Sequence, residues 1–392
     1  MSAAPRPLRG RLVARTLGAC LPLVVLAGVA APSTVPAAAP SGPAVSGRVT
    51  DVASTTVYGR WAANPRNPTN PLADRTWGVY MGNQEQAWQP YLRSTGDTRD
   101  LLAEIALRPK SKWFGAWIKP RDLASKVRSH IANAQAGDPD ALVQLTTFAM
   151  KPWEHAACTS LPTTSQRAFY RRWTDAFAQG IGNAHVAVVL QADGPFALCA
   201  PRGSKVYSSL IAYSARKLGS LPNAAVYIDA GAGDWLRDDV KRAAQLLIPA
   251  GVQYVRGFAL NATHYSPTER EVRFGGAVVR ELYLRGIRGK RFIVNTSSNG
   301  KGFAGYTYRG TNFDNARVCE TVLDSGCVTL GIPPTMDVAN PLWGLSATAR
   351  RKAASFCDAY MWFGRPWLYE QADPFDLDRA VKLVQTSPYS TL

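Results

Sequence analysis

The chain has 392 residues, of which 46% are hydrophobic, and carries a formal net charge of +17. This apolar content suffices for one large core and excludes a wholly disordered chain. The basic residues are spread along the sequence rather than clustered, which favours an ordinary solvated surface over a nucleic-acid-binding face.

Residues 1–40 have the pattern of a secretory signal peptide. Arginines precede an apolar stretch from Leu17 to Ala31, and small residues that suit cleavage follow it. The stretch is shorter than the about 20 residues that a membrane span requires, so we expect no stable membrane insertion after cleavage. Residues 41–66 predict a flexible lead-in, and residues 67–392 predict one folded domain of a secreted, monomeric protein.

Six cysteines are present, and Cys20 lies in the signal segment, which leaves an odd number in the secreted part. Export permits disulfides, so two bridges would leave one free thiol. The chain has no C-x-x-C motif and only four scattered histidines. We therefore expect no metal site and no cofactor.

From residue 77 onward, short apolar runs alternate with helical patterns. The predicted strands are Trp77–Tyr80, Lys112–Ile118, Val143–Met150, Val186–Gln191, Ala225–Ile228, Tyr254–Leu260, Arg291–Asn295 and Asp358–Phe363. The predicted helices include Pro120–Ala134, Ser165–Ile181, Tyr207–Leu218, Leu236–Leu247 and Thr268–Arg285. This alternation predicts an α/β fold whose parallel strands are joined by right-handed crossovers. Seven or eight units favour a closed, TIM-like barrel over a doubly wound open sheet, and no G-x-G-x-x-G follows a strand.

Two of the predicted strands end in an aspartate. Asp193 closes one apolar run and precedes Gly194-Pro195, and Asp229 closes the next run. The carboxyl ends of barrel strands form the active-site rim, so two acids there indicate acid/base chemistry. A carboxylate after a strand is also a common helix cap, which is a fair alternative for Asp234.

Other strand ends supply acids, amides and aromatic rings, the side chains of a carbohydrate cleft. These candidates are Trp153, Glu154, Trp235, Asn261, His264, Tyr265, Asn295, Trp362 and Glu370. Each tryptophan is equally well explained as a core residue, and His264 as a wall residue that forms hydrogen bonds. The absence of a G-x-S-x-G elbow disfavours a serine esterase. The irregular segment 302–345 is long enough to be functional.

Several ordered motifs resemble glycoside hydrolase family 6, the inverting β-1,4-glucanases. Residues 226–235, Val-Tyr-Ile-Asp-Ala-Gly-Ala-Gly-Asp-Trp, are similar to the family's Tyr-Leu-Asp-Ala-Gly-x-x-x-Trp segment. Residues 188–193 resemble its strand ending in Glu-Pro-Asp, and residues 257–265 its Gly-Phe-x-x-Asn-x-x-Asn-Tyr segment. Residues 292–300 resemble Ile-Asp-Thr-Ser-Arg-Asn-Gly, and residues 331–335 match Gly-x-Pro-Pro-Thr.

The resemblance implies a distorted seven-stranded β/α barrel and no cofactor. It makes Asp193 the proton donor, whose pKa must be raised, and Glu154 its supporting acid. It implies that Asp229 lines the sugar site and that Cys158 and Cys199 form a disulfide. Cys319 then pairs with Cys327 or Cys357, a choice that the sequence leaves open.

This chain departs from the family pattern at several charged positions. Gly364 and Leu368 replace a lysine and a glutamate, and Asn295 and Ser298 replace an aspartate and an arginine. Phe148 stands where the family often has tyrosine. The water-activating base is therefore open: Glu370 replaces a debated aspartate, and a water relay through Ser160 is the alternative.

These observations predict a secreted inverting hydrolase that cleaves internal β-1,4-glucosidic bonds of a cellulose-like polysaccharide. The lost charged positions leave a second hypothesis, a non-catalytic or weakly active carbohydrate-binding protein of the cell surface. A third is a hydrolase of another wall polysaccharide, which the basic charge suits. The expected partner is a β-glucan polysaccharide substrate.

Overall fold

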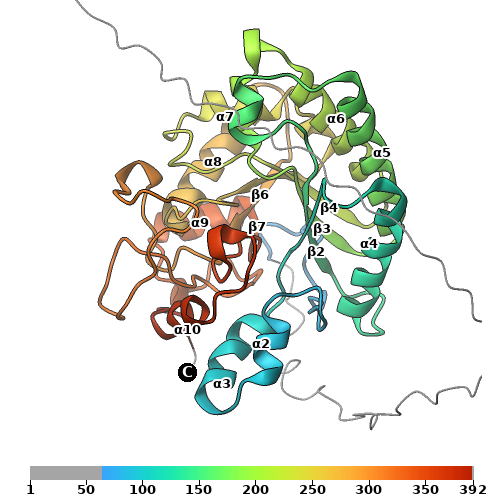
Figure 1. Cartoon of the computed structure of the whole chain (residues 1–392). Coiled ribbons are helices and arrows are strands. Elements are labelled where there is room, and N and C mark those ends of the chain that lie inside the picture. The colour runs from blue at the N-terminus through green and yellow to red at the C-terminus, as the bar shows by residue number, and fades with distance from the viewer. Residues whose placement is uncertain (1–63, 391–392) are drawn as a thin grey trace, which may run out of the picture. The chain divides into compact units, whose positions relative to one another are not determined.

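Seven strands form one sheet in chain order in the computed structural model, which describes residues 64–390 (Figure 1). They are β1 (Lys112–Gly115), β2 (Val143–Phe148), β3 (Val186–Leu190), β4 (Ala224–Asp229), β5 (Gly257–Leu260), β6 (Arg291–Asn295) and β7 (Cys357–Met361). Every neighbouring pair is parallel. The predicted seven-stranded parallel β/α fold is confirmed.

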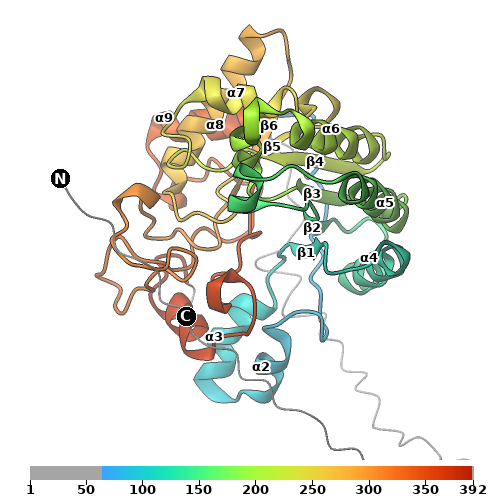
Figure 2. The same cartoon turned by 45° about the horizontal axis from the view of Figure 1, so that its top comes forward.

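Helices follow the strands and cover the outside of the sheet. They are α4 (Pro120–Gln135), α5 (Thr164–Ile181), α6 (Val206–Gly219), α7 (Val240–Leu247), α8 (Thr268–Leu284) and α9 (Ala347–Phe356). Figures 1 and 2 show α4, α5 and α6 side by side outside β2, β3 and β4. The remaining helices are α2 (Trp88–Arg93), α3 (Gly96–Ala106) and α10 (Leu377–Gln385), and α10 packs against α3 from the other end of the chain.

The two faces of each strand pack in different layers, as the alternation of side chains requires. On β3, Val186, Val188 and Leu190 join the cluster that includes helix residues such as Phe177. Ala187 and Val189 point instead into the curled sheet, where they pack with side chains of other strands such as Ala225, Tyr227 and Ile293. Burial on both faces explains why the strands have continuous apolar sequences.

The barrel is distorted because, within the described residues, β1 and β7 form no strand ladder. Two hydrogen bonds bridge them instead. The Ser111 N–H donates to the Trp362 carbonyl at 2.8 Å, and the Trp113 indole donates to the Phe363 carbonyl at 2.7 Å. The side chain of Trp113 is thereby held at the junction of the first and last strands.

Four predicted elements differ in the structure by three residues or more. The strand predicted as Lys112–Ile118 ends at Gly115. The segment predicted as strand Trp77–Tyr80 makes only an isolated bridge from Trp77 to Leu142. The helix predicted from Leu236 begins at Val240, because the Asp239 side chain caps it by accepting the Arg242 N–H. The strand predicted from Tyr254 begins at Gly257, because residues 252–254 form a 3₁₀ turn.

The structure contains the predicted disulfide between Cys158 and Cys199. A second disulfide joins Cys319 to Cys327, and Cys357 is a buried free thiol in β7. The predicted signal peptide, residues 1–40, and nearly all of the lead-in, residues 41–66, lie outside the described residues.

Candidate active site

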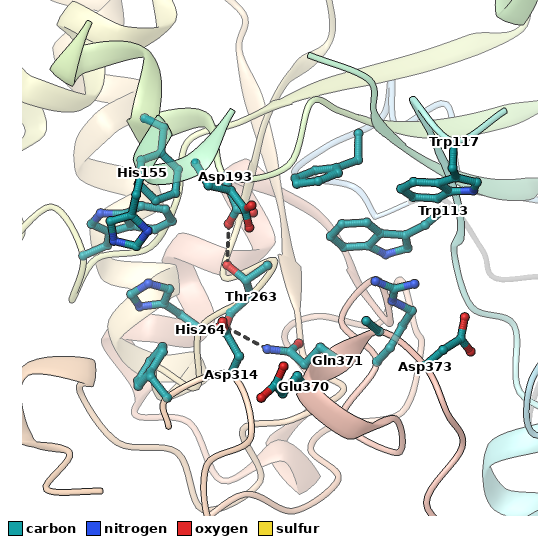
Figure 3. Close-up of a pocket in the computed structure, with 17 residues that line it drawn as sticks. Trp113, Trp117, His155, Asp193, Thr263, His264, Asp314, Glu370, Gln371 and Asp373 are labelled. Atoms are coloured by element: carbon teal, nitrogen blue, oxygen red, sulfur yellow. Dashed lines mark hydrogen bonds between the residues drawn. The ribbon is translucent and has the colours of Figure 1, made fainter. Parts of the chain in front are cut away.

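A cleft of about 1010 Å³ lies at the carboxyl ends of the strands (Figure 3). Its lining residues come from the ends of several strands or the loops that follow them: Trp113, Trp117, Phe148, Glu154, His155, Asp193, Phe196, Trp235, Thr263, His264, Phe313, Asp314, Arg365, Glu370, Gln371, Ala372 and Asp373. Five of these side chains are carboxylates. The site therefore has the position that the barrel topology predicts and the acids that the strand ends supply.

Asp193 follows β3 in a left-handed conformation, with φ 64° and ψ 35°, which is uncommon for a residue other than glycine. The residue is only 6% exposed, and its Oδ1 accepts a hydrogen bond from the Thr263 hydroxyl at 2.7 Å. Burial raises the pKa of Asp193 to about 6, and the charge of Glu154 adds to this increase, whereas the Thr263 hydrogen bond opposes it. The carboxyl group can therefore hold a proton close to neutral pH, as a general acid must.

Asp229 lies behind Asp193 and is not among the residues that line the cleft. Its carboxylate accepts the Gly194 N–H at 3.1 Å and the Gly231 N–H at 3.2 Å. Burial and the neighbouring Asp193 raise the pKa of Asp229 to about 8. A Cβ on Gly194 would lie 1.9 Å from the Asp229 carbonyl oxygen, so only glycine fits there. The contacts of Asp229 thus hold the backbone that follows Asp193, and its predicted sugar contact stays a prediction.

The disulfide connects the segments that carry Glu154 and Asp193. Glu154 begins the 3₁₀ helix η1 (Glu154–Cys158), and Asp193 precedes η2 (Gly194–Cys199). The bridge between the last residues of η1 and η2 therefore keeps the two acids on one side of the cleft. Burial, followed by the charge of Asp314, raises the pKa of Glu154.

Asp314 is a cleft acid that the sequence did not single out. It lies in the irregular segment 302–345, and the Tyr265 hydroxyl donates to its backbone carbonyl at 3.0 Å. Figure 3 shows Asp314 and Glu370 close together, with Thr263 between them and Asp193. Burial and the charge of Glu370 raise the pKa of Asp314. Asp314 follows no predicted strand, so no local sequence signal marks it.

Glu370 has a left-handed backbone, with φ 49°, and its Oε1 accepts a hydrogen bond from the Asn312 side chain at 2.7 Å. The adjacent Gln371 donates to the Thr263 carbonyl at 3.1 Å. Asp193, Glu154 and Glu370 all have positive φ angles. Sparsely populated backbone conformations gather at functional sites, which supports a role for these three acids.

Aromatic side chains form one wall of the cleft. The rings of Trp235 and His264 stack at a centroid distance of 4.8 Å, and Phe196 meets Trp235 edge-on. His264 Nδ1 lies 3.0 Å from the Asp234 carboxylate. Burial alone would raise the pKa of Asp234. The hydrogen bond and the charge of His264 instead hold this pKa below its usual value. Trp235 and His264 are thus fixed in the cleft where the sequence predicted sugar-binding residues.

Six further predicted site residues do not line the cleft: the sugar-binding candidates Trp153, Asn261, Tyr265, Asn295 and Trp362, and the water-relay candidate Ser160. The indoles of Trp153 and Trp362 are buried and donate to the backbone carbonyls of Ala192 and Ile332. Ser160 is exposed, and its carbonyl accepts the Tyr207 hydroxyl at 2.7 Å. The structure thus gives these residues protein partners, and their predicted contact with a sugar stays a prediction.

The two asparagines join the strand ends behind the cleft. The Asn295 Oδ1 accepts the N–H groups of Phe363 and Gly364, each at 3.0 Å, so β6 is tied to the loop after β7. The Asn261 amide donates to the carbonyls of Ser266 and Asn295. These buried polar groups are satisfied by the backbone and position the loops that carry the cleft.

Within residues 64–390, no group of three or more His, Cys, Asp or Glu side chains is placed to hold a metal ion. In the same range, no helix is both long and apolar enough to cross a membrane.

Comparison with known proteins identifies the family of this chain. The model of the glycosyl hydrolases family 6 matches residues 76–346. The chain belongs to this family.

Two curated relatives of this family 6 chain are endoglucanases. Endoglucanase A from Cellulomonas fimi is 32% identical over 233 residues, which cover 59% of this chain and 48% of the relative. Endoglucanase 1 from Streptomyces halstedii is 28% identical over 253 residues, covering 62% of this chain and 75% of the relative. The chain thus spans about half the length of the first relative.

Solved structures support the same fold. The endoglucanase Cel6 from Mycobacterium tuberculosis, in complex with methyl-cellobiosyl-4-deoxy-4-thio-β-D-cellobioside, superposes with a TM-score of 0.64 at 26% identity, covering 80% of this chain and 98% of that one. The endoglucanase CEL6B from Humicola insolens has a TM-score of 0.60 at 19% identity, covering 82% and 99%, and supports the fold alone.

Proposed function

We propose that this family 6 chain is a secreted hydrolase that cleaves internal β-1,4-glucosidic bonds of a cellulose-like glucan with inversion. The observation that carries the proposal is the buried Asp193 carboxyl at the end of β3, which lines the cleft with a pKa raised to about 6. The similarity to endoglucanases, one of them holding a thio-linked cello-oligosaccharide, supports the substrate class.

In this proposal Asp193 is the general acid. Its Oδ1 accepts the Thr263 hydroxyl, so the acidic proton belongs on Oδ2. That proton passes to the glycosidic oxygen as the bond to the anomeric carbon breaks, and the leaving sugar departs as an alcohol. The stacked Trp235 and His264 rings offer an apolar surface beside the acid on which a sugar ring can lie.

A water molecule attacks the anomeric carbon from the opposite face, and one carboxylate must take its proton. We assign this role to Glu370, which lies across Thr263 from Asp193 (Figure 3). Asp314 is its neighbour and the competing candidate. Azide distinguishes them, because it restores turnover only where the missing side chain was the base. We expect azide to rescue Glu370→Ala and not Asp314→Ala.

Hydrolysis of soluble mixed-linkage glucan and of cello-oligosaccharides tests the proposal, with Asp193→Asn as the matched control. We expect wild-type turnover with an α-configured first product by proton NMR, and loss of about 10³-fold or more in kcat for Asp193→Asn. Equal rates of the two proteins would rule out Asp193 as the acid. Saturable binding without turnover would instead support the carbohydrate-binding alternative.

The secreted location rests on the signal-peptide pattern of residues 1–40 and on two disulfides, which oxidising compartments favour. N-terminal sequencing of the exported protein tests it, and we expect a start within or just after the alanine-rich segment near residue 40. Size-exclusion chromatography with light scattering tests the expected monomer.

A further inference from the structure

A second cavity, of about 300 Å³, adjoins the cleft on the side of β1 and the loop after β7. It shares Trp113, Trp117, Arg365 and Asp373 with the cleft, so a bound chain can reach both. Four basic side chains line this cavity, Lys110, Lys112, Lys126 and Arg365, against two carboxylates, Glu85 and Asp373. We call this cavity, with the side chains that line it, the basic subsite. The proposed reaction at Asp193 does not use it.

Arg365 has a buried donor without a hydrogen-bond partner in the described residues, although the charges of Asp373 and Glu85 act on its guanidinium. Its guanidinium lies 4.3 Å from the centre of the Trp113 ring, and its buried Nε has no hydrogen-bond partner in the described part of the chain. Burial lowers the pKa of Arg365 to about 10, so the group is charged at neutral pH. A buried donor of this kind is costly unless a ligand or water satisfies it.

Lys110, Lys112 and Asp373 of the basic subsite have hydrogen-bond partners. Lys110 donates to the carbonyls of Ile105 and Ala106 at the end of α3, and Lys112 donates to the Gln84 carbonyl. Asp373 accepts the Gln86 amide at 3.2 Å. Lys126 is exposed on α4 at the rim. Arg365 is therefore the available donor, and Lys126 adds a positive charge that an incoming anion would meet.

Two tryptophans line the basic subsite beside this guanidinium. Trp113 carries Arg365 over its ring, and Trp117, which is 61% exposed, stands at the edge of both cavities. Figure 3 shows the two indoles on the side of the cleft away from His155 and His264. The exposed Trp117 indole offers a flat apolar surface for a sugar ring, whereas Trp113 is only 8% exposed and supports Arg365. A planar guanidinium matches a carboxylate in a bidentate pair.

We propose that the basic subsite binds the carboxylate of an acidic sugar unit, so that the preferred glucan carries units oxidised at C6 to the uronic acid. This inference rests on the proposed function for the presence of a glucan in the cleft. It adds that an acidic sugar unit binds beside Trp113, in a cavity that Asp193 does not line.

Binding to the Asp193→Asn protein tests this proposal without turnover. Calorimetry compares cellotetraose with the same tetrasaccharide carrying C6 carboxylates, at low and at high salt. We expect the oxidised ligand to bind about tenfold more tightly at low salt, as one charge-assisted hydrogen-bonded pair predicts, and to lose most of this advantage at high salt. Equal or weaker binding of the oxidised ligand would overturn the inference.

Two variants locate the effect. Arg365→Gln is expected to abolish the preference, measured as the ratio of the Kd of the oxidised ligand to that of cellotetraose in the same protein. Lys126→Gln is expected to reduce the preference for the oxidised ligand by a smaller factor. Because Lys126 is exposed, this substitution does not destabilise the fold. Arg351→Gln, on an exposed residue of α9 outside both cavities, is the matched control.

The outcomes separate this inference from the proposed function. A preference that survives Arg365→Gln, in a protein that melts like wild type, would refute the inference. If Arg365→Gln unfolds, the Lys126→Gln ratio and the salt dependence decide instead. A wild-type protein that fails to hydrolyse any glucan would refute the proposed function, and the binding comparison would still stand as measured.

Discussion

Replacing Thr263 by valine removes the one side-chain hydrogen bond that the structure gives to Asp193 and keeps the shape of the side chain. The Thr263 hydroxyl donates to Oδ1 at 2.7 Å and favours the ionised carboxylate, so it lowers the pKa of Asp193 against the effect of burial. Its loss therefore raises this pKa further. The acid is then protonated up to a higher pH than in the wild type.

The magnitude follows from the energy of one hydrogen bond to a buried charged group. Such a bond contributes about 1.5 kcal/mol or somewhat more, and one pKa unit corresponds to about 1.4 kcal/mol. The pKa of Asp193, about 6 in the wild type, is thus expected to rise by about one unit in Thr263→Val. Thr263→Ser keeps the hydroxyl and is the control.

The assay is the pH dependence of kcat/KM on a soluble glucan, whose alkaline limb reports the general acid of the free enzyme. We expect this limb near pH 6 in the wild type and in Thr263→Ser, and about one unit higher in Thr263→Val. A limb that stays in place, or moves to lower pH, would refute the reasoning that Asp193 is the acid and that Thr263 tunes it.

Stability offers an independent readout of the same group. The folded-state pKa of Asp193 lies above its unfolded value, so the carboxyl group binds more protons in the folded protein between the two values. Its stabilising contribution is complete below about pH 4 and is lost as pH rises through about 6. In Thr263→Val this loss should extend to higher pH, which urea unfolding at several pH values measures.

Three further changes test the site and its supports. Glu154→Gln removes a charge that raises the pKa of Asp193, so the alkaline limb should move to lower pH by a fraction of a unit; a shift to higher pH would contradict this. Asp358→Asn breaks a buried pair with Arg256 at 2.8 Å and should lower the free energy of unfolding by about 3–5 kcal/mol in urea titration, whereas a loss below about 1 kcal/mol would count against it. Replacing Cys158 and Cys199 by alanine together opens a loop with a sequence separation of 41 and should cost about 4 kcal/mol of unfolding free energy, with unchanged melting as the contrary result.

The sequence alone determined the fold class and the position of the general-acid candidate. Parallel strands buried on both faces need continuous apolar runs, and helices between them need a different period, so both patterns survive in the linear chain. Asp193 was identifiable because its run ends abruptly at Gly194-Pro195. The pairing of Cys158 with Cys199 followed from the family resemblance, and the structure contains it.

Only the tertiary structure decided which side chains reach the cleft. Trp362 and Asn295 sit at strand ends like the cleft residues, yet they turn away from the cleft and bond to backbone groups. Asp314 and Arg365 reach the cleft from loops whose paths no local pattern encodes. The physical reason is that a side chain's direction at a strand end depends on one residue of register and on distant partners, such as the Asn312 amide that holds Glu370.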